Sequence, residues 1–513
     1  MNLKKIDPKI KLGSFFDPIF TIGLNDIYVF KVFIDGKWVS FNSGETLDVT
    51  SPIDNRVIAK VQSTNSKEAE ETVDVAYKNK EKIREISAIE RIEIFERAKK
   101  IMLDHKDEFV NTLVLEAGKP VKDAEGEVEA TAERMEMTME EARKIFGEYI
   151  PGDWSKDTRG KIALVIREPV GVVAAISPFN YPLYISSAKV IPALLSGNAA
   201  VCKPPSDDPV SLLLLARVLE AAGIPAGTLN VVTGSGHVVG DALVSNEKVE
   251  MVSFTGSTET GKHIAQLASA KKQHLELGGK GVAVVLEDAD LNFAAKKCVE
   301  GSLKNAGQRC DAVSAILVVE SVADPFVEMV VREVDQWKLG DPREPTTRVG
   351  PVINERAVKK VHSLVEDAVE KGAKLLRGGH FKGCYYEPTV LDRVPLEARI
   401  AWEETFGPVV TIIRVKDENE ALEIANKPRY GLDSCVFSND FYKIWKIAKK
   451  MQTGGITVND APRHGVGYFP FGGTKGSGIG REGIGYSIEE MTYMKTLVFN
   501  LEPAKLGKTR SHA

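Results

Sequence analysis

Apolar and polar residues follow two different patterns along the chain, and these patterns predict where helices and strands lie. From about residue 66 to 148, apolar residues recur at three- and four-residue intervals on a charged background, which predicts a group of amphipathic helices. Residues 1–64 instead combine short apolar runs with Gly, Pro and Asn. This mixture is typical of strands joined by turns, so we expect an extended N-terminal segment that is rich in strands.

Short β-rich runs alternate with helical segments from residue 171 onward. Five such runs are GVVAAIS, NAAVCK, LNVVTG, VEMVSFTG and KQHLEL. The segments SLLLLARVLEAAG and TGKHIAQLASA between them have the composition of helices. Strands that alternate with helices at this spacing predict a parallel, doubly wound α/β sheet. The pattern restarts after the glycine cluster LGGKG and continues to about residue 450, which predicts a second α/β domain.

Two segments fit neither series. Residues 149–171 predict a pair of strands between the helices and the first sheet, and the C-terminal run TYMKTLVFNL predicts a strand with no obvious neighbour in the sequence. An unpaired apolar strand exposes its backbone groups for pairing with another chain. We therefore expect this strand to lie at a subunit interface.

Length and charge place the chain among ordinary globular proteins of two or three domains. It has 513 residues, of which 43% are hydrophobic and 27% charged, and its formal net charge is -5. This balance gives no reason to expect a nucleic-acid or membrane partner. Near the N-terminus, Asp17, Pro18, Asp26 and Lys31 interrupt any signal-peptide core or membrane span. We therefore expect a cytoplasmic protein.

The five cysteines form no C-x-x-C pair, and the eight histidines include no H-E-x-x-H motif. Zinc and iron-sulfur sites need several converging ligands, so the sequence predicts no metal site. An odd number of cysteines in a reducing compartment also argues against a disulfide framework. Cys310, in the stretch NAGQRCDAVSA, is then either a packed thiol or a nucleophile, and composition alone favours the packed thiol.

Two glycine-rich loops resemble phosphate-binding motifs without matching them. TGSTETGKH comes within one residue of the G-x-x-x-x-G-K-[ST] loop, but His263 replaces the hydroxyl that would bind magnesium. A nucleotide hydrolase is thus only a minor alternative, although backbone N–H groups of such a loop can still approach a pyrophosphate. TGSGHVVGDAL has the spacing G-x-G-x-x-x-G, which is one residue longer than a dinucleotide fingerprint, and predicts a plain strand-to-helix turn.

Four short stretches together point to a known family: SPFNYP with Asn180, CKPPSDDP with Lys203, LELGGKG with Glu276, and GQRC with Cys310. With FTGSTETG, EETFGPVV and PFGGTKGSGIGREG, they make the chain resemble the aldehyde dehydrogenase superfamily from about residue 33 to 500. Each residue taken singly has an ordinary structural interpretation, as a turn, a strand or a packed residue. Their combination in this order is what carries the resemblance.

The resemblance implies a particular division of the chain into an α/β fold. A Rossmann-type cofactor domain would comprise residues 1–148 and 170–276, and an α/β catalytic domain residues 277–486. A small β oligomerisation element would comprise residues 149–169 and 487–513. The family usually assembles as a homotetramer, which we expect here.

The resemblance also implies roles for three catalytic residues. Cys310 would attack the aldehyde as a thiolate, which is the nucleophilic form of the side chain. The amide of Asn180 and the backbone N–H of Cys310 would stabilise the oxyanion. Glu276 would activate the water that hydrolyses the thioester. Relatives that transfer the acyl group to coenzyme A generally lack this glutamate, so its presence favours release of a free acid.

Seven residues would surround the cofactor: Pro178, Lys203, Ser206, Gly256, Ser257, Glu404 and Phe406. Lys203 would contact the adenosine ribose, and many members that prefer NAD carry a glutamate three residues later. This chain has Ser206 there, which can accept a 2′-phosphate that a carboxylate would repel. We therefore expect NADP as the preferred cofactor, with NAD as the alternative because Asp207 is adjacent.

The expected substrate is an anionic aldehyde. Arg309 precedes the nucleophile, and Arg463 with His464 lies on the loop that would line the substrate entrance. The alternative is that Arg309 only lowers the pKa of the thiol or pairs with Asp311.

The residues of these motifs are most similar to those of the non-phosphorylating glyceraldehyde-3-phosphate dehydrogenases. Tyr181 and Arg309 of this chain match residues that bind the substrate phosphate in that subfamily. Gly485 stands where some members have an arginine, which leaves Arg463 or Arg134 to complete the site. The sequence thus predicts NADP-dependent oxidation of glyceraldehyde 3-phosphate to 3-phosphoglycerate, with water resolving the thioester. The same chemistry on lactaldehyde or succinate semialdehyde is an alternative, and a non-catalytic dinucleotide-binding or structural relative is another.

Overall fold

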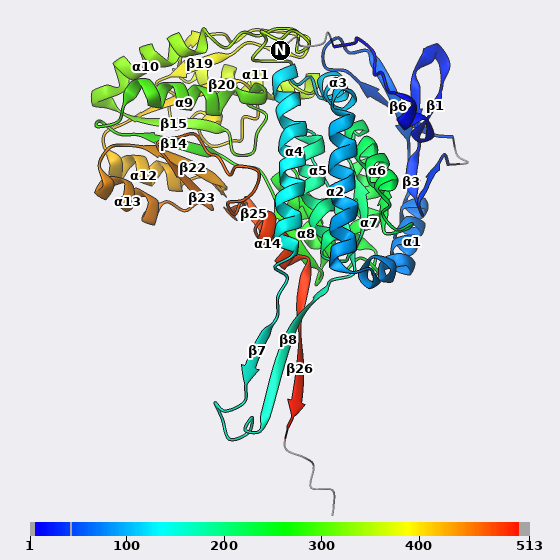
Figure 1. Cartoon of the computed structure of the whole chain (residues 1–513). Coiled ribbons are helices and arrows are strands. Elements are labelled where there is room, and N and C mark those ends of the chain that lie inside the picture. The colour runs from blue at the N-terminus through cyan, green and yellow to red at the C-terminus, as the bar shows by residue number, and fades with distance from the viewer. Residues whose placement is uncertain (1–5, 42–43, 502–513) are drawn as a thin grey trace, which may run out of the picture.

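The computed structural model of the chain describes residues 6–41 and 44–501. Two α/β lobes lie side by side, and a narrow β-sheet projects from the lobe that contains the N-terminal half (Figure 1). This arrangement confirms the predicted fold class. Residues beyond 501 in the expected oligomerisation element, and residues 1–5 and 42–43 in the expected cofactor domain, lie outside the described residues.

The predicted helical region forms four consecutive helices. They are α1 (Ser66–Glu85), α2 (Ala88–Asp104), α3 (Lys106–Ala117) and α4 (Val121–Ala142). Asn65 and Ser87 begin α1 and α2 with capping boxes, in which each side chain accepts from the backbone N–H three residues later. Buried residues of α2, α3 and α4 pack into one core on one face of the first sheet (Figure 1). Ala69, Val73 and Ala76 of α1 belong to a second core on the opposite face of that sheet.

The first sheet contains eight strands in the order β25-β13-β12-β9-β10-β11-β3-β4. Its five central strands are parallel, as predicted: β9 (Val172–Ile176), β10 (Ala199–Lys203), β11 (Leu229–Val231), β12 (Met251–Thr255) and β13 (Lys272–Glu276). The antiparallel edges are β3 (Val32–Ile34) with β4 (Lys37–Val39), and β25 (Gly478–Ile479). The helices α5 (Pro182–Leu195), α6 (Val210–Ala222), α7 (Asp241–Ser245) and α8 (Thr258–Ala268) connect the parallel strands. The edge strand β25 comes from the range expected in the catalytic domain and therefore ties the two lobes together.

The second lobe is built on a seven-stranded sheet of order β16-β19-β20-β15-β14-β22-β23, parallel except for β16. Its strands are β14 (Gly281–Val285), β15 (Val313–Val319), β16 (Lys374–Arg377), β19 (Thr389–Asp392), β20 (Val409–Val415), β22 (Asp433–Phe437) and β23 (Gly455–Val458). Its helices are α9 (Leu291–Leu303), α10 (Glu320–Val334), α11 (Glu355–Glu370), α12 (Glu418–Asn426) and α13 (Phe441–Lys450). The central strands β14 and β15 are buried along their whole length, as a sheet covered on both faces requires.

The projecting sheet consists of β7 (Glu148–Pro151), β8 (Lys161–Pro169) and β26 (Thr492–Asn500) (Figure 1). The C-terminal strand β26 thus has a partner in its own chain, because it pairs antiparallel with β8 along its whole length. The other edge of β26 pairs with no strand of the described residues. Met494 and Val498 on β26 are 61% and 63% exposed, so the sheet presents apolar side chains to its surroundings.

The topology gathers the predicted site at one edge of the first sheet. Lys203 and Glu276 are the last residues of β10 and β13, and Asn180 follows β9. Carboxyl ends of parallel strands share one edge of a sheet, which is where ligands bind in such folds. Cys310 reaches this edge from the other lobe, on the loop between α9 and β15.

Candidate active site

Two cavities meet at Cys310. One, of about 870 Å³, runs along the carboxyl edge of the first sheet, and the other, of about 420 Å³, lies between α4 and the loop that carries Arg463. Cys310, Asn180 and Thr255 line both cavities. A molecule in either cavity can therefore reach the same sulfur atom.

The backbone before Cys310 is held in an uncommon conformation. Asn305, Ala306 and Gly307 have φ angles of 53°, 54° and 71°, in the left-handed region that residues with a Cβ rarely adopt. Hydrogen bonds fix this turn. The side chain of Asn305 donates to the backbone oxygen of Asn180 at 2.9 Å, and that of Gln308 accepts from the backbone N–H of Ile353 at 2.9 Å. Strained backbone that its surroundings hold in this way is often found at functional sites.

The environment of Cys310 favours the neutral thiol. Cys310 is partly exposed, whereas the other four cysteines are buried. Burial within the site, together with the nearby carboxylates of Asp311, Glu276 and Glu404, raises the pKa of the Cys310 thiol well above its ordinary value, and the Arg309 guanidinium opposes this rise. A positive charge brought next to the sulfur would lower the pKa and favour the reactive thiolate.

Asn180 is positioned through its backbone, which leaves its side chain available. Its carbonyl oxygen accepts hydrogen bonds from the Lys119 ammonium and the Asn305 amide, both at 2.9 Å. Lys119 forms a buried ion pair with Glu127. Within residues 6–41 and 44–501, neither the Asn180 side-chain amide nor the backbone N–H of Cys310 makes a hydrogen bond. These two donors are free to bind an oxyanion in the cavity.

Glu276 is buried with one oxygen unsatisfied. Its Oε1 lies 3.1 Å from Nε2 of His274, whereas Oε2 is buried and has no hydrogen-bond partner. Burial and then the charge of Glu482 raise the pKa of the Glu276 carboxyl well above its ordinary value, and the Lys189 ammonium opposes this. Burial also lowers the pKa of His274 to about 3, so that imidazole is neutral. A buried carboxyl with a spare oxygen and a raised pKa is suited to exchanging a proton with water.

All seven residues expected around the cofactor line the larger cavity. Burial lowers the pKa of Lys203 to about 8. The Lys203 ammonium donates to the oxygen of Pro204 at 2.9 Å and to the Ser206 hydroxyl at 3.4 Å. Asp207 is the residue that made NAD an alternative cofactor. Its carboxylate accepts a hydrogen bond from the Asn354 side chain at 3.1 Å. The side chain that accepts from the Lys203 ammonium is therefore a hydroxyl and not a carboxylate.

The far end of this cavity is formed by the second lobe. Glu404 accepts from the backbone N–H of Gly279 at 3.0 Å, and Phe406 packs edge-on against Phe179 with ring centroids 5.7 Å apart. Arg356 and Lys360 on α11 also line the cavity, and neither makes an ion pair within the described part of the chain. Sequence reasoning missed these two cations, although their i, i+4 spacing places both on one face of a helix.

The strand-to-helix turn after β11 also faces the larger cavity. Gly236 and Gly240 line it, so the loop TGSGHVVGDAL lies at the cavity although it lacks the dinucleotide spacing. The loop TGSTETGKH lies opposite. Its Ser257 caps α8 and accepts from the backbone N–H of Thr260 at 3.2 Å, and Gly256 also lines the cavity.

All five residues expected to bind the substrate line the smaller cavity: Arg309, Tyr181, Arg463, His464 and Arg134. Each cationic group among them already has an acidic partner. Arg309 forms a two-point ion pair with Asp311 at 3.1 and 2.6 Å, as the alternative interpretation held. Arg463 pairs with Glu300, His464 with Asp433, and the buried Arg134 with Glu482 at 3.4 Å. The expected cluster of free positive charge is therefore absent at these residues.

Two lysines of the smaller cavity have no such partner. Lys122 on α4 and Lys304, six residues before Cys310, both line it. Neither side-chain ammonium forms a hydrogen bond or an ion pair with any described residue, although the charge of Lys304 acts on Asp123. The motif comparison did not identify these lysines. The position of Lys304 on the nucleophile loop is the signal that could have found it.

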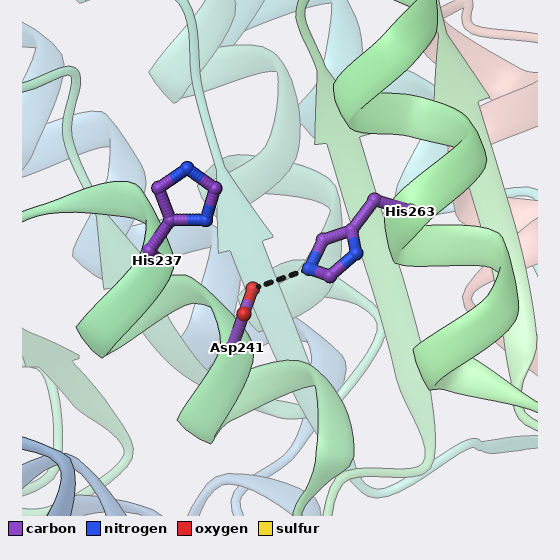
Figure 2. Close-up of side chains that lie close together, drawn as sticks. All are labelled: His237, Asp241 and His263. Carbon is purple, nitrogen blue, oxygen red and sulfur yellow. Dashed lines mark hydrogen bonds and ion pairs between the residues drawn. The ribbon is translucent and has the colours of Figure 1, made fainter.

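The sequence predicted no converging metal ligands, but at one place the fold brings three such side chains together. His237, Asp241 and His263 bring their ligand atoms within 4.8 Å of one another, and His263 Nε2 lies 3.0 Å from Asp241 Oδ1 (Figure 2). His237 and His263 are 26 residues apart in the sequence, on a turn and on a helix that only the fold brings together. No spacing motif describes such a group.

Comparison with known proteins agrees with this geometry. Residues 38–497 match the model of the aldehyde dehydrogenase family. The chain belongs to the aldehyde dehydrogenase family. In this family member, within the described residues, no helix is long and apolar enough to cross a lipid bilayer.

Several relatives match over nearly their whole length. An NADP-dependent glyceraldehyde-3-phosphate dehydrogenase of Streptococcus equinus is 40% identical and covers 92% of this chain and 99% of its own. A lactaldehyde dehydrogenase of Methanocaldococcus jannaschii is also 40% identical, over 91% of this chain and all of its own. The structure of the NADP-dependent glyceraldehyde-3-phosphate dehydrogenase of Bacillus halodurans C-125 in complex with NADP is 38% identical. It superimposes with a TM-score of 0.90 over 92% of this chain and 99% of the other.

Proposed function

We propose that this aldehyde dehydrogenase oxidises glyceraldehyde 3-phosphate to 3-phosphoglycerate, with NADP as hydride acceptor and water as the group that releases the acid. The observation that carries the proposal is the position of Cys310 where two cavities meet, beside the free amide of Asn180. A reactive sulfur between a cofactor cavity and a substrate cavity is what oxidation through a covalent intermediate requires. The names of the relatives from Streptococcus equinus and Bacillus halodurans support the choice of substrate and cofactor.

The larger cavity suits NADP. Lys203 and Ser206 lie together where a ribose phosphate would need a cation and a hydroxyl. The carboxylate of Asp207 instead accepts a hydrogen bond from Asn354. Arg356 and Lys360 add free positive charge for the other phosphates. NADP bound in this cavity would accept hydride at its nicotinamide ring. NAD remains the alternative cofactor, which a serine at 206 does not exclude.

The side chains of the site can carry out both halves of the reaction. The Cys310 thiolate forms a bond to the aldehyde carbon, and the Asn180 amide and the Cys310 N–H stabilise the oxygen as it becomes negative. Departure of hydride from that carbon leaves a thioester on the sulfur. Glu276 then takes a proton from water, whose oxygen attacks the thioester carbon. The carbon–sulfur bond breaks, the acid is released and the thiolate is restored, so no inorganic phosphate takes part.

The smaller cavity offers charge for the phosphate of the substrate at Lys304 and Lys122. We assign these lysines in addition to Arg309 and Tyr181, because the guanidinium of Arg309 is already paired with Asp311. The pairing of the arginines favours a second candidate, the same oxidation of lactaldehyde, which carries no charge and needs no free cation. The name of the relative from Methanocaldococcus jannaschii supports this second candidate.

We also infer a homotetramer in the cytoplasm. Within residues 44–501, the edge of the projecting sheet at β26 has no partner strand, and Met494 and Val498 expose apolar side chains there, which a neighbouring subunit would cover. All five cysteines are free thiols, which fits a reducing compartment. Size measurement in solution, before and after substitution of Val498 by Asp, tests the assembly.

A steady-state assay without inorganic phosphate tests the proposed reaction. We expect kcat/KM for glyceraldehyde 3-phosphate to exceed that for glyceraldehyde and for lactaldehyde, with NADP preferred over NAD. Equal values for glyceraldehyde with and without its phosphate would reject the substrate. Cys310→Ala separates an enzyme from a non-catalytic relative, because an enzyme loses turnover while retaining NADP binding.

A further inference from the structure

The larger cavity carries a group of side chains for which the proposed reaction has no use. His237, Asp241 and His263 all line this cavity, and their ligand atoms lie within 4.8 Å of one another. His237 belongs to the short π-helix Gly236–Gly240, Asp241 begins α7, and His263 lies on the first turns of α8. Figure 2 shows the two imidazole rings on either side of the carboxylate.

We propose that His237, Asp241 and His263 bind a divalent transition cation of the Zn²⁺ type, and that the bound cation excludes the dinucleotide from the cavity. Two imidazoles and one carboxylate are a common ligand set for Zn²⁺ and unsuited to Mg²⁺ or Ca²⁺, which prefer oxygen ligands. Three protein ligands leave one coordination position open, which water fills. The cation is taken from solution and undergoes no redox change.

The three side chains need only a small movement to reach a common ion. His263 and Asp241 are already 3.0 Å apart, and His237 is exposed, so its ring is free to rotate. Ligand atoms around tetrahedral zinc are roughly 3.4 Å apart, given bonds of about 2.1 Å. Because all three ligand atoms lie within 4.8 Å of one another, no pair has to close by more than roughly 1.4 Å to reach this spacing.

The position of these ligands explains why the cation and the dinucleotide would compete for the cavity. The turn that carries His237 and the helix that carries His263 form two walls of the same cavity. An ion bound to both walls links them and lies in the space between them. The inference relies on the proposed function only in that the competitor is a dinucleotide, and the metal site itself does not depend on which aldehyde is oxidised.

Metal binding is best measured on the full-length chain with Cys310→Ser, because the partly exposed thiol is itself a zinc ligand and the other cysteines are buried. Titration with Zn²⁺ by calorimetry, and with Co²⁺ by its visible absorption, reports stoichiometry and ligand geometry. We expect one ion per chain with the spectrum of a low-coordinate nitrogen and oxygen site. His237→Gln and His263→Gln, made separately in this background, should each weaken Zn²⁺ binding at least about tenfold.

His362→Gln is the matched control. His362 lies 3.2 Å from Glu366 on α11, a pair with a single imidazole that lies outside the larger cavity, so this substitution should leave Zn²⁺ binding unchanged. Binding that persists in the double variant of His237 and His263, or no binding at all, overturns the site.

Competition is tested by repeating the titration with saturating NADP, after NADP binding to the metal-free protein has been shown. We expect the apparent affinity for Zn²⁺ to fall at least about tenfold, and by linkage Zn²⁺ should weaken NADP binding by the same factor. Unchanged Zn²⁺ affinity overturns the exclusion. If NADP fails to bind the metal-free protein, the proposed cofactor is at fault, whereas the histidine variants still decide the metal site.

Discussion

Arg309 and Asp311, the residues on either side of Cys310, form a two-point ion pair with each other, from Nε to Oδ1 at 3.1 Å and from Nη2 to Oδ2 at 2.6 Å. The negative charge of Asp311 therefore largely offsets the effect of the Arg309 guanidinium on the Cys310 sulfur. The carboxylate lies close enough to raise the pKa of the thiol, and the net effect of the surroundings favours the protonated form. The loop thus holds the nucleophile in a form that needs another positive charge to become reactive.

Asp311→Asn should lower the pKa of Cys310. The substitution removes a negative charge beside the sulfur and releases Arg309, and both changes favour the thiolate. The rate of alkylation by iodoacetamide, followed between about pH 6 and pH 10, reports the thiolate fraction. We expect its midpoint to move to lower pH and the rate near neutral pH to rise by about three- to tenfold. Cys310→Ser provides the background rate, and an unchanged or upward-shifted midpoint would contradict the role given to Asp311.

Glu276→Gln should stop the reaction after hydride transfer. The amide keeps the shape of the side chain but takes no proton from water, so the thioester on Cys310 accumulates. Rapid-mixing measurements should show a burst of about one NADPH per subunit, followed by turnover reduced by about 10²- to 10⁴-fold. Alkylation of Cys310 should be retained, because removal of a nearby carboxylate favours the thiolate. If the burst is lost together with turnover, Glu276 is needed at or before hydride transfer instead.

Ser206→Glu should reverse the choice of cofactor. The new carboxylate would lie next to the Lys203 ammonium, which is now 3.4 Å from the serine hydroxyl, and would repel a 2′-phosphate. We expect KM for NADP to rise about 10- to 100-fold, while KM for NAD stays unchanged or falls. Ser206→Thr keeps the hydroxyl and should keep the preference. A variant with glutamate that still prefers NADP would show that the phosphate binds elsewhere, for example at Arg356.

The fold and the main site residues were accessible from the sequence because they depend on local patterns. Runs such as GVVAAIS and NAAVCK form the buried parallel strands β9 and β10, since strands covered on both faces must be apolar throughout. The motifs around Asn180, Glu276 and Cys310 follow the ends of strands or precede them. Strand order places Asn180 and Glu276 near one sheet edge, and only the family resemblance added Cys310 from the other lobe. In the structure, all three residues line one cavity.

The charge balance of the site could not be predicted in the same way. Arg463 pairs with Glu300, which is 163 residues away, and His464 pairs with Asp433 on a neighbouring strand. These contacts depend on how one loop meets a helix and a strand from other parts of the second lobe, which no local motif records. A list of cations near the substrate entrance therefore overstated the free positive charge, and it omitted Lys304, whose lack of an ion pair is visible only in three dimensions.

Lys304→Ala should weaken recognition of the substrate phosphate specifically. Lys304 lines the smaller cavity without an ion pair to any described residue, so its charge is available to a ligand. A hydrogen bond to a charged group contributes about 1.5–3 kcal/mol, which corresponds to a loss of about 10- to 100-fold in kcat/KM for glyceraldehyde 3-phosphate. The value for glyceraldehyde should change by less than about twofold, and Lys304→Arg should restore much of the loss. Lys296→Ala removes the same charge from an exposed position on α9 outside the cavity and serves as the control. If both substrates lose activity equally, Lys304 supports the nucleophile loop and does not bind phosphate.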